Sequence, residues 1–111
     1  MDTRTALLAA HDLIQEEGWI QGKRHNKMGY CAFGALKQSV FGDADADAAQ
    51  HAVTKGIIFT QAVLALYDYI ESDNDFYWNY GNVPTLAGYN DFPGRSKEEI
   101  LTMFTTAANN C

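Results

Sequence analysis

Cys31 is the residue of this sequence that is best suited to nucleophilic chemistry. It follows Gly29-Tyr30 at the expected start of a helix, where the helix dipole would stabilise a thiolate and lower the pKa of the thiol. A base close to the thiol would activate it, and an amide such as that of Asn90 can orient an imidazole. These residue types suggest a cysteine-dependent hydrolase or transferase, with a buried and inert thiol as the alternative. The candidate catalytic residues are Cys31, Asn90 and the histidines His25 and His51, and His11 is a third histidine of the chain.

Polar side chains in apolar surroundings mark two further stretches, residues 18–22 (GWIQG) and 89–95 (YNDFPGR). If Gln21, Cys31 and Asn90 converge in the fold, they form either a buried hydrogen-bond network or the floor of a small-ligand pocket. Asp91 can accept hydrogen bonds from backbone N–H groups of the turn at residues 93–94 or of the last helix. Arg95 can pair with Asp91 or with a carboxylate or phosphate of a ligand. The predicted binding residues are therefore Trp19, Gln21, Cys31, Asn90, Asp91 and Arg95.

The negative charge of the chain is concentrated in one third of its length. The formal net charge is −6, and residues 43–75 contain seven acidic residues against Lys55 alone, so this segment carries the whole excess. An acidic face repels nucleic acid and attracts basic partners, whereas the simpler interpretation is a solvated surface that keeps a small protein dissolved. We predict a surface that faces a basic partner protein, formed by Asp43, Asp45, Asp47, Asp73 and Asp75.

Several classes of protein are not expected from this sequence. The acidic residues at 43–47 have the opening spacing of a calcium loop, but Ala48 and Thr54 replace its glycine and its glutamate. The histidines and cysteines lack zinc spacing, and no phosphate-binding glycine loop is present, so we predict neither a metal nor a cofactor. No apolar run reaches the roughly 18 residues of a membrane span, and no secretion signal is visible, so a cytoplasmic protein is expected. Direct nucleic-acid binding is not expected, and the sequence leaves the oligomeric state open.

The hydrophobic periodicity predicts a single all-α domain over residues 1–111, with four to five short helices around one core. The expected helices cover residues 5–17, 30–41, 46–55 and 58–72, with Gly56 either breaking or kinking the middle pair, and a last helix capped by Ser96 and Glu99. A long aromatic loop at 73–94 precedes that last helix. A small β-hairpin near residues 19–30 is possible, because Gly22 and Gly29 can bracket one.

Three stretches, residues 18–22 (GWIQG), 30–36 (YCAFGAL) and 89–100 (YNDFPGRSKEEI), resemble a family of small bacterial and phage proteins that is defined only as a domain of unknown function. The resemblance covers nearly the whole chain in order. It implies a phage or mobile-element origin and assigns no catalytic residue. A small acidic protein of that origin suggests an accessory protein that binds and inhibits a host protein, such as a nucleic-acid-handling or defence enzyme.

Overall fold

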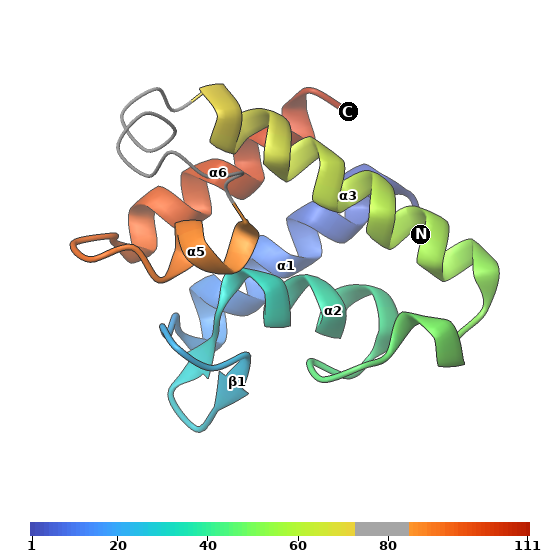
Figure 1. Ribbon diagram of the computed structural model, residues 1–111, viewed down its shortest axis with the longest axis horizontal. Coiled ribbons are helices and arrows are strands. Elements are labelled where there is room, and N and C mark those ends of the chain that lie inside the picture. Colours follow the sequence, from blue (N-terminus) through green and yellow to red (C-terminus); the bar gives the residue numbers. More distant parts are fainter. Residues whose placement is uncertain (73–84) are drawn as a thin grey trace.

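The computed structural model describes residues 1–72 and 85–111, and these residues form a mainly helical fold with one small hairpin (Figure 1). The described α-helices are α1 (Thr3–Glu17), α2 (Ala32–Phe41), α3 (Val53–Ser72), α5 (Leu86–Asn90) and α6 (Lys97–Asn109). A 3-10 helix, η1 (Ala48–Gln50), precedes α3, and β1 (His25–Asn26) pairs antiparallel with β2 (Gly29–Tyr30). The predictions of an all-α fold and of a hairpin within residues 19–30 are both confirmed.

The core forms where α1 packs against α6, α2 and α3. The apolar residues of α1 recur at three- and four-residue intervals, which places them on one face of the helix. The completely buried side chains of α1 and α6 include Leu7, Ala10, Ile14, Ile100, Met103 and Phe104. Figure 1 shows α1 in the middle of the molecule with α3 and α6 above it and α2 below, so the first and last helices share one core.

Three of the helices begin or end at capping residues that can be recognised in the sequence. Asp2 accepts a hydrogen bond from the backbone of Thr5 at the start of α1, at 2.7 Å. At the start of α6, Ser96 and Glu99 form the expected capping box, in which each side chain accepts from the backbone of the other residue. Gly42 ends α2 in the left-handed conformation.

Three of the predicted boundaries are wrong. The middle pair of helices is one helix, α3, which begins at Val53 and continues through Gly56, while residues 48–50 form only a 3-10 turn that Asp47 caps. Helix α2 begins at Ala32 rather than at residue 30, because Tyr30 belongs to strand β2. The short helix α5 lies within the predicted loop of residues 73–94. The rest of that loop, residues 73–84 with most of its aromatic side chains, lies outside the described residues.

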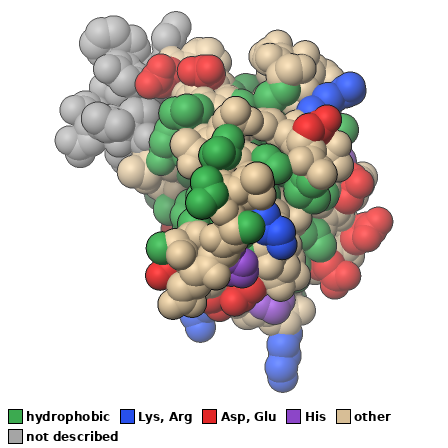
Figure 2. Space-filling model, turned by 90° about the vertical axis from the view of Figure 1, so that its right-hand side faces the viewer, with side chains coloured by type: hydrophobic (Ala, Val, Ile, Leu, Met, Phe, Trp, Pro, Cys, Tyr) green, Lys and Arg blue, Asp and Glu red, His purple; other side chains and the backbone are tan. Residues whose placement is uncertain are grey.

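The outer side of α3 carries large apolar side chains that no described residue covers. Val53, Ile57 and Leu64 are 77%, 52% and 57% exposed, and their spacing of four and seven residues places them on one face of the helix. We call these three residues the apolar stripe. The face of the molecule in Figure 2, seen from the right-hand side of Figure 1, shows hydrophobic side chains gathered at its centre and acidic side chains at its margins.

No helix in residues 1–72 or 85–111 combines the length and the hydropathy that a membrane crossing requires.

Candidate functional site

The side-chain amide of Asn90, which is 0% exposed, is the centre of a polar network. Its Oδ1 atom accepts from Trp19 Nε1 at 2.7 Å and from the backbone N–H of Ala32 at 2.9 Å. Its Nδ2 atom donates to the carbonyl of Ile20 at 3.0 Å and to Asp91 Oδ1 at 2.9 Å. Both donor hydrogens and both acceptor positions of the amide are therefore used. In consequence, Asn90 does not hold any of the histidines in orientation.

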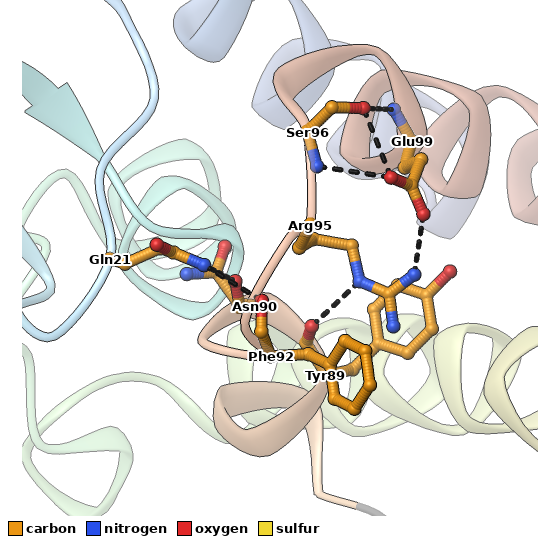
Figure 3. A network of polar contacts seen from close by, with 7 residues as sticks. All are labelled: Gln21, Tyr89, Asn90, Phe92, Arg95, Ser96 and Glu99. Atoms are coloured by element: carbon orange, nitrogen blue, oxygen red, sulfur yellow. Dashed lines mark hydrogen bonds and ion pairs between the residues drawn. The ribbon is translucent and has the colours of Figure 1, made fainter. Parts of the chain in front are cut away.

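Gln21 joins the same network from its edge (Figure 3). Its Nε2 atom donates to the backbone carbonyls of Asn90 and Phe92, both at 3.1 Å. The backbone N–H of Gly22 donates to Asp91 Oδ1 at 2.9 Å, which is a different partner from the turn that we expected for this carboxylate. The stretches that contain Gln21, Cys31 and Asn90 meet in the structure, and at Gln21 and Asn90 they form a hydrogen-bond network at the entry of the hairpin.

The sequence offered Asp91 as one possible partner of Arg95, but in the structure Arg95 bonds to Tyr89 and Glu99 instead. Its Nε atom donates to the carbonyl of Tyr89 at 3.0 Å, and its Nη1 atom donates to Glu99 Oε2 at 2.6 Å. The guanidinium carbon lies 3.7 Å from the centre of the Tyr89 ring (Figure 3). Burial opposes the charge of Glu99, but the hydrogen bonds from Arg95 and Ser96 outweigh it and lower the pKa of Glu99 below its usual 4.5. Arg95 thus fastens α5 to α6.

Cys31 is the N-cap residue of α2 and is only 6% exposed. Its Sγ atom accepts from the backbone N–H of Gly34 at 3.3 Å, and its own N–H donates to the carbonyl of Arg24 at 3.1 Å. Burial raises the pKa of the thiol above its usual 9.0, against the lowering effect of the Gly34 and Phe33 N–H groups. The predicted lowering of this pKa is therefore wrong, because desolvation outweighs the field of the helix end.

The structure separates the candidate bases. His51 packs on Phe41 at the end of α2, with ring centres 4.8 Å apart, whereas Cys31 caps the beginning of that helix. The ten residues of α2 span about 15 Å, which separates the thiol from this imidazole. His11 contacts its neighbour Asp12 on α1, at 3.0 Å. His25 is the candidate that shares a cavity with Cys31.

This cavity has a volume of about 680 Å³ and lies between the hairpin, the start of α2, α3 and α5. Its lining includes Cys31 and His25 but not Trp19, Gln21, Asn90 or Arg95. The described lining residues are Gly22, Lys23, Arg24, His25, Cys31, Phe33, Asp45, Tyr67, Thr85, Leu86, Ala87 and Asp91. Sequence reasoning did not find Phe33 or Tyr67, because their spacing is that of core residues. The basic run at residues 23–25 was the available signal.

Three of the predicted acidic residues, Asp43, Asp45 and Asp47, are exposed on the loop of residues 43–47, which we call the acidic loop, while Ala44 and Ala46 of this loop are buried. Asp43 Oδ1 accepts from the backbone N–H of Asp45 at 2.9 Å, and Asp47 Oδ1 accepts from that of Ala49 at 3.0 Å. Asp45 lies 3.6 Å from the guanidinium of Arg24. The other two predicted members, Asp73 and Asp75, lie outside the described residues. Within residues 1–72 and 85–111 no three acidic, histidine or cysteine side chains are grouped to hold a metal ion.

Because the thiol of Cys31 is buried and its pKa is raised, we expect it to react with Ellman's reagent far more slowly than the exposed thiol of Cys111. At pH 8 one protein thiol per chain should react in the first phase and release one thionitrobenzoate, and the second should react only after denaturant is added. The neutral thiol favours the folded state below pH 9, and this contribution is lost as the pH rises above 9 because the unfolded chain ionises first. Rapid reaction of two thiols in the native protein would contradict this assignment.

The fold and the site define a small helical protein with a buried amide network and a cavity beside a capped, neutral thiol. The chain belongs to DUF6197, a family of unknown function that matches residues 1–110. This finding confirms the family part of the resemblance. Neither the curated proteins nor the solved structures include a match for the chain.

Proposed function

We propose that this protein is a small accessory protein of phage or mobile-element origin that binds and inhibits a host protein in the bacterial cytoplasm. The observation that carries the proposal is the position of the acidic loop directly before an exposed apolar surface on η1 and α3. Such a pairing of charge and apolar area suits a partner with a basic groove next to apolar side chains, such as a nucleic-acid-handling or defence enzyme.

The apolar part of this surface is larger than the three residues of the apolar stripe. A shallow hollow of about 450 Å³ lies beside it. The residues that line the hollow are Ala48, Ala49, Val53, Gly56, Ile57, Thr60 and Gln61. Contiguous exposed apolar area of this kind marks interaction sites in folded proteins. Val53 and Ile57 belong to both the apolar stripe and the hollow, and we expect Ile57, the larger of the two and the one nearer the middle of the stripe, to contribute most to binding.

The acidic part continues this surface without a gap in the chain. Asp47 caps η1, and the next two residues, Ala48 and Ala49, line the hollow. Within residues 1–72 and 85–111 no basic side chain pairs with Asp43 or Asp47. A basic partner would be attracted by these two charges and held by the apolar contacts behind them. Asp45 contributes less, because Arg24 already lies beside it.

The test is affinity capture from a bacterial host lysate, followed by titration of each captured protein in purified form. The Asp43→Asn/Asp47→Asn variant removes two charges but keeps the oxygen atoms that accept the turn hydrogen bonds. We expect it to weaken binding about tenfold at low salt and to reduce the salt dependence. The Ile57→Lys variant should weaken binding by more than about tenfold at any salt concentration.

The matched control is Glu16→Gln/Glu17→Gln, which removes two exposed charges at the end of α1. It should leave the affinity within about twofold of the natural protein, since those charges lie on another element. A partner whose affinity is unchanged by both test variants binds elsewhere, and the proposed surface would then be wrong.

The cysteine-dependent enzyme is retained as a second candidate because Cys31 and His25 line one cavity. Cys31→Ser keeps a hydroxyl that can cap α2 but removes the thiol. Full biological activity of this variant would exclude a cysteine-dependent reaction.

A further inference from the structure

We infer that the cavity beside Cys31 is a binding site for a small planar aromatic anion. This site is separate from the partner surface proposed above. Its volume of about 680 Å³ falls in the range of sites that enclose most of a small organic ligand.

The walls of the cavity favour a ligand with a planar aromatic ring system. Phe33 and Tyr67 contribute half-buried aromatic rings from α2 and α3, and Leu86 and Ala87 contribute apolar surface from α5. Aromatic rings offer flat apolar contact area at a small entropic cost, so a flat ring system is the ligand that these walls accommodate best.

The basic side chains at the rim of the cavity favour a ligand that carries an anionic group. Lys23, Arg24 and His25 line the cavity from the hairpin, and two carboxylates, Asp45 and Asp91, line it as well. Asp45 lies beside the guanidinium of Arg24, so the charges of these two residues offset each other. Asp91 accepts hydrogen bonds from the neutral donors Gly22 and Asn90 at the base of the hairpin, so its carboxylate oxygen is engaged there although its charge remains.

Lys23 differs from these groups. In the described part of the chain no carboxylate lies within ion-pair distance of its ammonium group. The neutral thiol of Cys31 adds no negative charge to the cavity. A carboxylate, sulfonate or phosphate placed beside Lys23 would therefore pair with an ammonium group that no described carboxylate contacts.

The hairpin wall of the cavity is held in place before any ligand arrives. The carbonyl of Arg24 accepts from the N–H of Cys31, and the same carbonyl lies so close to Gly34 that a Cβ atom there would be 2.1 Å from it. A preformed wall avoids the cost of ordering a loop on binding.

The experiment uses two fluorescent probes with the same ring system. One is 8-anilino-1-naphthalenesulfonate, an anion built on a planar naphthalene ring, and the other is the neutral N-phenyl-1-naphthylamine. We expect the sulfonate to bind the natural protein saturably with one site per chain, and the neutral probe to bind at least about threefold more weakly. Equal affinity for the two probes, or the absence of saturable binding, would overturn the inference.

Two substitutions locate the bound probe. Ala87→Trp fills the cavity from an exposed position of α5 and should weaken the binding of the sulfonate by at least about tenfold. Lys23→Glu should weaken it about three- to tenfold. The matched control Lys27→Glu makes the same charge change on the same hairpin at a residue outside the cavity lining, and should change the affinity by less than about twofold.

Ile57→Lys separates this site from the partner surface. The variant should leave the binding of the sulfonate unchanged, because Ile57 does not line the cavity. Binding that is lost in Ile57→Lys but survives Ala87→Trp would place the probe on the apolar stripe and would overturn the inference. Failure of partner binding in Ile57→Lys, with sulfonate binding intact, would leave the cavity site standing on its own.

Discussion

The Asn90→Leu substitution is expected to lower the free energy of unfolding by about 3–4 kcal/mol, the largest loss of stability that we predict for a single substitution. Leucine has the branched shape and the number of side-chain heavy atoms of asparagine, so the substitution leaves no cavity and its effect reports mainly the lost hydrogen bonds. Three groups lose their partner at once, namely Trp19 Nε1, the N–H of Ala32 and the carbonyl of Ile20. Each unsatisfied buried group costs about 1–3 kcal/mol, with water recovering part of that at the half-buried Trp19 and Ile20.

Urea denaturation followed by circular dichroism measures this loss, and Gln21→Ala is its control. Gln21 makes two hydrogen bonds to backbone carbonyls from an exposed position, so its removal should cost only about 0.5–1 kcal/mol. If Asn90→Leu costs less than about 1 kcal/mol, the amide network does not stabilise the hairpin in the way described here.

The Gly34→Ala variant is expected to lose about 2–3 kcal/mol of stability, although alanine normally favours a helix. A Cβ atom at residue 34 would meet three backbone atoms of Arg24, at 2.1, 2.7 and 3.0 Å. Backbone cannot rotate away as a flexible side chain can, so the hairpin has to move off α2. The thermal midpoint should fall, and the exposure of Cys31 to Ellman's reagent should increase, because the moved hairpin no longer covers the thiol.

Gly56→Ala is the matched control, and its expected effect on stability has the opposite sign. Gly56 also lies inside a helix, and a Cβ atom added there meets nothing within 4 Å. This variant should therefore be more stable than the natural protein by about 0.5–1 kcal/mol, the ordinary gain from glycine to alanine in a helix. Equal effects of the two substitutions would show that the contact between residues 24 and 34 is not close.

Local signals in the sequence were enough for most of the fold. The capping box at Ser96 and Glu99 and the glycine at residue 42 are chemical features of a few neighbouring residues, and the structure contains both. The sequence left open whether Gly56 breaks the helix, because propensity weighs against glycine, whereas a long helix with one packed face tolerates a single glycine. Helix α5 was missed because five residues are too few to show a period.

The candidate site was only partly predictable for a different reason. The convergence of residues 18–22, 31 and 90 followed from polar residues in apolar surroundings, which need partners wherever they are buried. The cavity depends on how far apart α2, α3 and α5 lie, and no pattern within a single segment contains that distance. The pKa of Cys31 likewise depends on burial by the hairpin, which a helix position alone does not indicate.

The amide of Asn90 bonds to residues that precede it in the chain by 58, 70 and 71 positions, and the first helix, α1, packs on the last one, α6. The N-terminal helix therefore lacks one of its native neighbours, α6, until the end of the chain has been synthesised. Contacts with such large sequence separations slow folding, so native structure should form late, after most of the chain has left the ribosome. Until then the part of the apolar face of α1 that α6 covers in the native fold stays open to solvent.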